Sequence, residues 1–201
     1  MLNRNRLAIL ALGAALAAAP AFSQQPEYAR SDFSVQAFGS FVKSTTDNGV
    51  PQTASDSGGV LASYRFFFTS HQGVEVNYGY SLNTQSYGAA AGPLGVKAGD
   101  HEVTAAYVYR HPMRRFTPFV EAGAGGLVFN PTGGASGAST QARAAFVYGA
   151  GADFSVTRQL FVRAEYRGLV YNSPTFDLLA AAGLDRVTHR AEPSVGFGYR
   201  F

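Results

Sequence analysis

The sequence predicts an all-β fold, an eight-stranded antiparallel up-and-down transmembrane β-barrel, and three observations support it. Only 14% of the 201 residues are charged, against roughly 25% in an ordinary soluble domain, and Gly (23), Phe (16) and Tyr (11) are abundant instead. Apolar and polar residues alternate with period two in eight segments, and the connections between these segments are alternately short and long. The composition excludes a disordered charged tail and a coiled coil. The lack of an apolar run of about 18 residues beyond the N-terminus argues against a bundle of membrane-spanning helices.

The first residues have the pattern of a secretory signal peptide. Arg4 and Arg6 precede an apolar stretch over 7–19, and Ala21 and Ser23 supply the small residues of a cleavage site. A cut after Ser23 or after Ala21 fits, and the alternatives are a membrane anchor or a core helix, for which the stretch is short. We therefore expect a signal peptide over 1–23 and one outer-membrane β-barrel domain over 24–201.

The composition also excludes several kinds of partner and of chemistry. The predicted signal peptide contains Arg4 and Arg6 and no acidic residue, so its removal brings the formal net charge of +3 closer to neutrality. Lys and Arg do not cluster, so we expect no nucleic-acid partner. The chain has no cysteine, which excludes disulfides, Cys-ligated zinc and thiol catalysis.

The first four predicted strands alternate Phe, Val, Ala or Tyr with Ser, Gln, Glu, Asn, Arg or Gly. They span 32–43 (from Phe33), 59–69 (from Val60), 73–81 (from Val74) and 101–110 (from Val103). The last four carry more glycine on the polar side. They span 117–129 (around Val120), 141–155 (around Phe146), 160–171 (from Leu160) and 186–201 (around Val195).

The connections predict two different ends for the barrel. Those over 69–72, 111–116 and 156–159 are short, whereas those over 44–58, 82–100, 130–140 and 172–185 are long and rich in Gly, Ser, Thr, Asn and Pro. Short periplasmic turns and long extracellular loops are typical of bacterial outer-membrane barrels. We therefore expect both termini in the periplasm and the long loops outside the bacterial cell.

Three features favour an apolar face toward lipid over a soluble cup with an apolar interior. Glycines recur on the polar face, where a narrow lumen needs small residues. Aromatic residues crowd the apolar face near strand ends, as in the girdles of membrane barrels. The polar-face charges balance, as buried charges must: they are Arg65, Arg110, Arg163, Arg167, Arg190 and Arg200 against Glu75, Glu102, Glu121, Asp153, Glu165 and Glu192.

The end of the sequence carries its most specific motif. Val195, Phe197, Tyr199 and Phe201 alternate with polar or small residues and resemble the C-terminal signal that the barrel assembly machinery recognises. RFTPFVEAGAG over 115–125 resembles a proline–aromatic strand of the OmpA-like family of small outer-membrane barrels, and FVRAEYR over 161–167 resembles its penultimate strand. The resemblance covers the predicted mature chain, with no peptidoglycan-binding domain expected after it.

The resemblance implies a lumen closed by ion pairs among Arg65, Arg110, Glu121, Arg163, Glu165 and Arg167. It also implies a structural role in the envelope or a surface interaction of the adhesin type. A narrow pore for small solutes and a lipid-modifying enzyme are the alternatives. Expected partners are outer-membrane lipid, lipopolysaccharide and the assembly machinery, for a monomer without a cofactor or metal.

The four histidines give little support to catalysis. His71, His101 and His111 fall in or beside connections, and only His189 lies on a strand near the long loops. Lipid A deacylase barrels place a serine two residues after such a histidine, where this chain has Ala191. Arg186, His189 and Arg190 are expected near the outer rim, where they would meet lipopolysaccharide phosphates.

Overall fold

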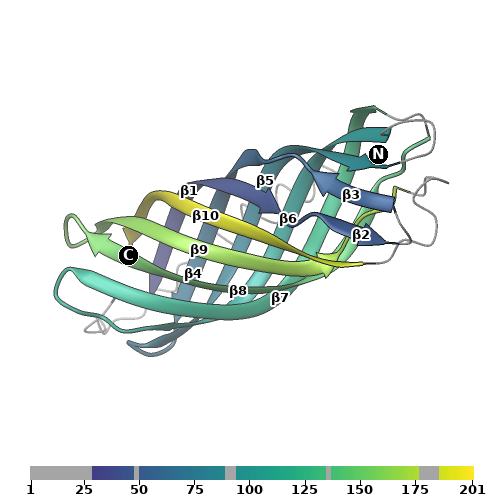
Figure 1. Ribbon diagram of the computed structural model, residues 1–201. Coiled ribbons are helices and arrows are strands. Elements are labelled where there is room, and N and C mark those ends of the chain that lie inside the picture. Colours follow the sequence, from purple (N-terminus) through teal and green to yellow (C-terminus); the bar gives the residue numbers. More distant parts are fainter. Residues whose placement is uncertain (1–28, 48–49, 89–93, 135–136, 177–185) are drawn as a thin grey trace, which may run out of the picture.

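The computed structural model describes residues 29–47, 50–88, 94–134, 137–176 and 186–201, which form β-strands joined by turns and loops (Figure 1). The signal peptide predicted over 1–23 lies outside these residues. Among them, no helix is long and apolar enough to cross a membrane. The strands are β1 (Ser31–Val42), β2 (Thr45–Asp47), β3 (Val50–Ala54), β4 (Ser57–Phe67), β5 (Gln72–Tyr87), β6 (Leu94–Arg110), β7 (Phe116–Gly134), β8 (Gln141–Ser155), β9 (Leu160–Asn172) and β10 (Val187–Arg200).

Eight of these strands close into a ring. The order is β1, β4, β5, β6, β7, β8, β9 and β10, with each pair antiparallel, and β10 pairs with β1 to complete the barrel. In the closing pair, Val35 lies opposite Phe197. β2 and β3 form a hairpin outside the ring, and β3 pairs with the end of β5. The predicted eight-stranded antiparallel barrel is confirmed.

The two ends of the barrel differ. The connections between β4 and β5, β6 and β7, and β8 and β9 are tight turns, such as the one closed by Met113 N–H and Phe116 O at 3.0 Å. The first described residues meet the last at this end, where Ser31 N–H donates to Phe201 O at 3.2 Å. We call this the short-turn end, which is on the left in Figure 1, and the opposite one the long-loop end.

Several strands extend beyond their predicted limits at the long-loop end. β5 continues to Tyr87, β6 begins at Leu94 and β7 continues to Gly134, so the loops predicted over 82–100 and 130–140 are in large part strand. The loop predicted over 44–58 contains β2 and β3. Alternation in space persists over 82–87, where Asn83, Gln85 and Tyr87 are buried, but polar residues on both faces remove the hydropathy signal.

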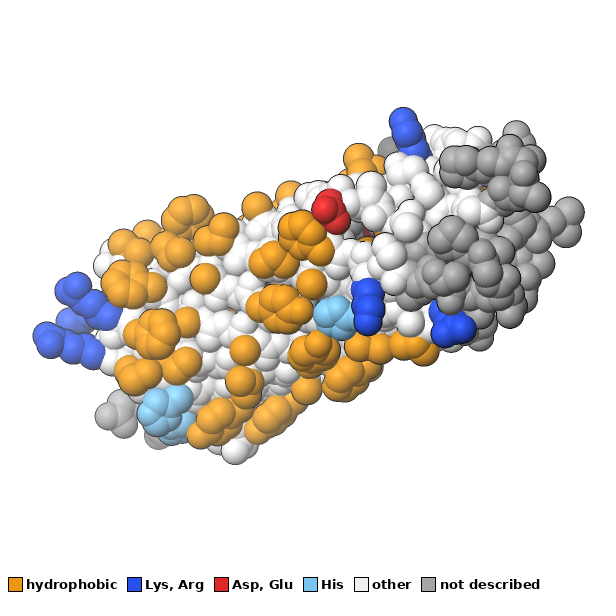
Figure 2. Space-filling model, in the orientation of Figure 1, with side chains coloured by type: hydrophobic (Ala, Val, Ile, Leu, Met, Phe, Trp, Pro, Cys, Tyr) orange, Lys and Arg blue, Asp and Glu red, His pale blue; other side chains and the backbone are white. Residues whose placement is uncertain are grey.

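The outer wall is apolar and the inner wall is mostly polar. Outward residues such as Val35, Val103 and Phe197 are 46%, 56% and 73% exposed, and apolar side chains cover the middle of the barrel wall in Figure 2. A closed barrel with an exposed apolar band is a transmembrane barrel, since lipid is the partner that such a surface requires. The alternative of a soluble cup with an apolar inner face is wrong for the membrane-level part of the barrel.

Candidate functional site

A network of charged side chains fills the middle of the lumen. Alternation along each strand points every second residue inward, and the inward set includes Arg65, Arg163, Arg167 and Arg190, each at most 1% exposed. Charges buried this deeply need ionic partners. The interior ion-pair network comprises Asp32, Arg65, Glu75, Asp100, Glu102, Glu121, Asp153, Arg163, Glu165, Arg167, Arg190, Glu192 and Arg200.

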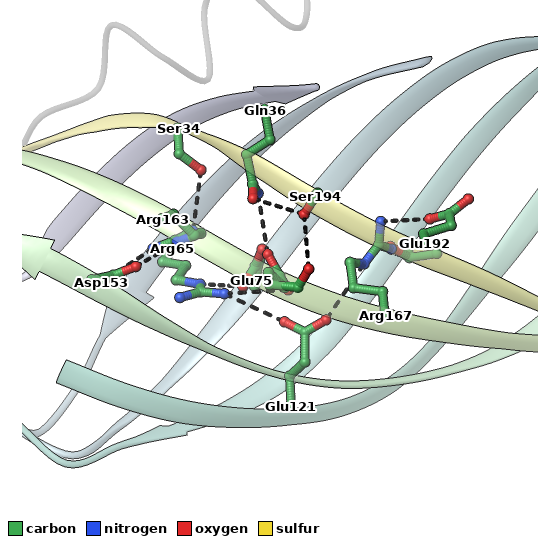
Figure 3. Close-up of polar contacts among 12 residues, drawn as sticks. Ser34, Gln36, Arg65, Glu75, Glu121, Asp153, Arg163, Arg167, Glu192 and Ser194 are labelled. Atoms are coloured by element: carbon green, nitrogen blue, oxygen red, sulfur yellow. Dashed lines mark hydrogen bonds and ion pairs between the residues drawn. The ribbon is translucent and has the colours of Figure 1, made fainter. Parts of the chain in front are cut away.

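Arg163 organises the part of the network nearest the short-turn end (Figure 3). Its Nε and Nη2 donate to the two oxygens of Asp153 at 2.7 and 3.1 Å, a bidentate geometry. Nη2 also donates to Asp32 Oδ1 at 3.2 Å, and Nη1 donates to Ser34 Oγ at 3.1 Å. Arg200 Nη2 lies 3.3 Å from Asp153 Oδ2. One carboxylate therefore holds two guanidinium groups from neighbouring strands.

Three glutamates surround Arg65 at the centre of the lumen. Arg65 Nε donates to Glu75 Oε2, and its Nη2 lies 3.5 Å from Glu121 Oε2 and 3.8 Å from Glu165 Oε1. Oxygens of the three carboxylates lie within 4.8 Å of one another, as in a cation site. Because the Arg65 guanidinium contacts all three, it already supplies positive charge there. Its Cζ also lies 3.8 Å from the centroid of the Phe119 ring.

Arg167 and Arg190 share two glutamates nearer the long-loop end. Arg167 donates to Glu102 Oε1, and its Nη1 lies 3.3 Å from Glu192 Oε2. Arg190 Nη2 lies 3.0 Å from Glu102 Oε2 and 2.6 Å from Glu192 Oε1, and Nη1 lies 3.4 Å from Asp100 Oδ2. Each of these glutamates thus bridges two arginines, and loss of either would leave two buried cations short of a partner.

Glu121 connects Arg65, at the centre of the lumen, to Arg167, nearer the long-loop end. Its Oε2 faces Arg65 and its Oε1 lies 3.5 Å from Arg167 Nε. Gln36 adds a link from another wall, because its Nε2 donates to Glu165 Oε2 at 3.1 Å while its Oε1 accepts from Ser194 Oγ at 3.0 Å (Figure 3). The central part of the network is therefore continuous with the part nearer the long-loop end, and it connects strands that are not neighbours in the ring.

Arg110 differs from the other predicted ion-pair residues. It is 6% exposed, and its guanidinium lies 3.4 Å from the centroid of the Phe67 ring. Its Nε and Nη2 donate to the carbonyl oxygens of Ser70 and Ala29 at 2.9 and 3.2 Å. In the parts of the chain that the structure describes, Arg110 forms no salt bridge, and the ion pair expected for it stays a prediction. Its described polar partners near the short-turn end are backbone carbonyls.

Three members of the network lie where the sequence pattern does not predict them. Asp32 is absent from the predicted polar-face charges, Asp100 falls in a predicted loop, and Arg190 is also expected at the outer rim. All three are 1% exposed, so Arg190 does not face the outer leaflet. Residues two apart on a strand face the same side of the sheet. Asp32 therefore faces the lumen with Ser34, and Asp100 faces it with Glu102.

An apolar cluster fills the lumen toward the long-loop end. Its buried members are Tyr87, Val96, Ala98, Ala106, Leu127, Phe129, Ala145, Val147, Leu169, Tyr171 and Phe176. Phe176 follows β9, has φ of +53° and packs edge-on against Phe129 at 6.4 Å between ring centroids. Tyr87 Oη donates to Pro174 O at 2.5 Å. The interior is therefore polar at the centre and apolar beyond it, a change that the expectation of a polar lumen missed.

The histidines lie on or near the outer surface, beside tyrosines or each other. His101 Nδ1 lies 2.8 Å from Tyr78 Oη, and His189 Nε2 lies 2.9 Å from Tyr148 Oη. His71 and His111 are neighbours near the short-turn end, with ring centroids 6.0 Å apart. Tyrosine and histidine rings at such levels suit the interface between lipid and water.

The residues of the predicted assembly signal form an outward row on β10 and beyond it. Val195, Phe197, Tyr199 and Phe201 are 56%, 73%, 41% and 58% exposed. Tyr199 and Phe201 stack with ring centroids 6.2 Å apart. The row faces the surroundings of the barrel, while β10 pairs through its backbone with β1 and β9.

Comparison with known proteins places this barrel in a family. No curated protein matches the chain. Similar solved structures include OprG from Pseudomonas aeruginosa (TM-score 0.60, 18% identity, covering 87% of this chain and 97% of that one). Neisserial surface protein A is also similar (TM-score 0.57, 18% identity, covering 84% of this chain and 97% of that one). So is Ail of Yersinia pestis (TM-score 0.51, 20% identity, covering 86% of this chain and 99% of that one). At these identities the likeness concerns the fold.

The family evidence is direct and covers almost the whole sequence. The model of the outer membrane protein beta-barrel domain matches residues 8–201. The solved structures above are likewise small outer-membrane barrels. The chain therefore belongs to the outer membrane protein beta-barrel domain family.

Proposed function

We propose that this protein is a closed, non-conducting barrel that has a structural role in the bacterial outer membrane. The observation that carries the proposal is the interior ion-pair network, in which four arginines at most 1% exposed reach carboxylates on other walls of the lumen. An eight-stranded barrel is just wide enough for side chains to fill it. The apolar cluster adds a second obstacle to water and ions.

A narrow pore for small solutes is the main alternative. An ion that crossed the lumen would have to separate buried salt bridges such as Arg163–Asp153 and Arg190–Glu192, whose charges would then lack partners. The test is solute flux into phospholipid vesicles that contain the folded protein. We expect the rate of protein-free vesicles, with a 16-stranded porin as the positive control, and flux at porin-like rates would refute the proposal.

The proposed orientation places the short-turn end in the periplasm and the long-loop end outside the cell. Support comes from the strand extensions and the β2–β3 hairpin, which build up the wall at the long-loop end, as expected of outer-membrane barrels. Because the chain has no cysteine, Asp56→Cys and Arg158→Cys provide single probes of the two ends. An impermeant maleimide should label the first in intact cells and the second only after permeabilisation, and the reverse pattern would invert the orientation.

A surface interaction through the long-loop end is a second proposed function. Ail is an attachment invasion locus protein and has been solved with a heparin analogue, and another similar structure is a neisserial surface protein. In this chain, the β2–β3 hairpin lies outside the closed ring. Deletion of residues 45–54 should therefore abolish adhesion of expressing cells to host cells without preventing barrel folding, and adhesion equal to the parent would argue against this hairpin as the interacting part.

Lipid modification is the least supported alternative. His189 bonds to Tyr148 on the outer surface, and the position two residues after it is Ala191. We expect mass spectra of lipid A and phospholipids to be the same with and without the protein. A modified lipid that disappears in His189→Gln would establish an enzyme instead.

Assembly through the C-terminal row is also proposed. Phe201 is 58% exposed and lies 6.4 Å from Tyr64 between ring centroids. Phe201→Ser should lower the amount of heat-modifiable barrel in the outer membrane, whereas Phe154→Ser, a matched change at a 51% exposed aromatic residue, should lower it less. Lipid and lipopolysaccharide remain the expected partners of the outer wall.

A further inference from the structure

Exposed basic side chains gather at the short-turn end. Arg114 and Arg115 lie in the turn between β6 and β7, Arg158 lies in the turn between β8 and β9, and Arg30 precedes β1. His71 and His111 lie beside them. Figure 2 shows blue and pale blue side chains at this end of the molecule. We call Arg30, His71, His111, Arg114, Arg115 and Arg158 the basic rim.

Within the described ranges, the protein does not neutralise the arginines of this rim. The acidic side chains nearest this end, Asp32 and Asp153, are 1% and 2% exposed and are paired with Arg163 inside the barrel. The exposed Asp56 precedes β4 and lies at the long-loop end. The salt bridges among the described residues involve none of the rim arginines. The rim therefore presents positive charge to its surroundings.

The basic rim also borders the apolar band. Met113 and Phe116 flank Arg114 and Arg115 and are each 47% exposed. Val156 and Leu160, on the two sides of Arg158, are 62% and 49% exposed. Long basic side chains beside such residues keep their stems on apolar surface and their charges in the headgroup region. The groups that meet them at this depth are the headgroups of the adjacent lipid leaflet.

We infer that the basic rim binds the phosphate groups of anionic phospholipids in the leaflet that surrounds the short-turn end. Guanidinium groups match phosphate oxygens in bidentate geometry, and a cluster of basic residues beside a membrane attracts anionic lipid. The rim residues come from three turns and the start of β1, so lipids would bind around the circumference rather than in one pocket. This inference goes beyond the proposed closed lumen and does not depend on it.

The test measures which lipids stay bound to the folded protein. The protein is reconstituted into vesicles with equal amounts of phosphatidylglycerol and phosphatidylcholine and extracted in mild detergent, and retained lipids are counted by native mass spectrometry. The wild type should be enriched in phosphatidylglycerol, and Arg114→Gln with Arg158→Gln should reduce that enrichment by about tenfold. The matched control removes two exposed charges at the long-loop end, Lys43→Gln with Lys97→Gln, and should keep the enrichment.

Further arms keep the result interpretable. Arg114→Lys with Arg158→Lys retains the charge and should retain most of the enrichment, which separates charge from local turn structure. Heat-modifiable gel mobility selects the folded fraction of every variant. Three results would each overturn the inference. They are lipid retention in proportion to the vesicle composition, an equal loss of enrichment in Lys43→Gln with Lys97→Gln, and full displacement of the lipid by inorganic phosphate. Solute flux should be the same in all variants, so failure here is distinguishable from failure of the closed-lumen proposal.

Discussion

Arg190 on β10 and Glu102 on β6 stand on opposite walls of the barrel, and Arg190 Nη2 nevertheless donates to Glu102 Oε2 at 3.0 Å. Three strands separate them in either direction around the ring. The contact therefore crosses the whole width of the lumen. Glu102 also accepts from Arg167 on β9, so a single carboxylate ties together three parts of the wall.

Removal of the Glu102 charge should destabilise the barrel. Glu102→Gln keeps the side-chain volume but leaves Arg167 and Arg190 without the charge they share, and breaking a buried pair of this kind costs about 3–5 kcal/mol. The chain has no Trp to serve as a fluorescent probe, so unfolding in urea is followed by circular dichroism, which gives the free energy of unfolding. Asp56→Asn, at an exposed acid, should change it by less than about 0.5 kcal/mol. Equal stability of the two variants would contradict the role given to Glu102.

A methyl group at Gly123 should also destabilise the barrel. An added Cβ would lie 2.0 Å from Ala105 O and 2.5 Å from Ala106 Cα on the neighbouring strand, and overpacking of this kind costs about 1–3 kcal/mol. Gly133 is on the same strand, and a Cβ there would meet nothing within 4 Å. Gly123→Ala should therefore lower the urea midpoint while Gly133→Ala leaves it nearly unchanged. Similar midpoints for both would show that close strand approach at Gly123 is not required.

A cysteine placed in the lumen should be protected from a water-soluble reagent. Ser63 is 1% exposed and faces the interior from β4, and Ser63→Cys changes its volume little. In the folded protein this thiol should react with a charged maleimide far more slowly than the thiol of Asp56→Cys, at an exposed position. Both should react at similar rates in urea. Fast labelling of the folded Ser63→Cys variant would mean that water and reagent enter the lumen.

The membrane-level part of the fold was predictable because lipid and lumen impose opposite demands on successive residues. Val35, Val103 and Phe197 face lipid while their sequence neighbours face inward, which gives a clear period of two. Over 82–87 the strand continues without that contrast, since Thr84 and Ser86 are as polar as the buried Asn83 and Gln85. A strand outside the apolar band therefore resembles a loop in the sequence.

The network was predictable in composition but not in pairing. The alternation along each strand identifies which charges face inward, and it places Asp32 on the same face as Ser34. It does not say that Arg190 meets Glu102 across the lumen or that Arg65 meets three glutamates. Those pairings depend on the stagger between strands around the closed ring, and no hydropathy pattern records that stagger. The same limit explains Arg110, whose partners are backbone carbonyls.

Whether the lumen is closed can be measured by single-channel recording. Folded wild-type protein, verified by gel mobility, is added to a planar phospholipid bilayer in molar potassium chloride, with a 16-stranded porin as the positive control. We expect a baseline without discrete steps for the wild type, because buried salt bridges and the apolar cluster fill the interior. Reproducible, long-lived conductance steps from the folded wild-type protein would contradict it.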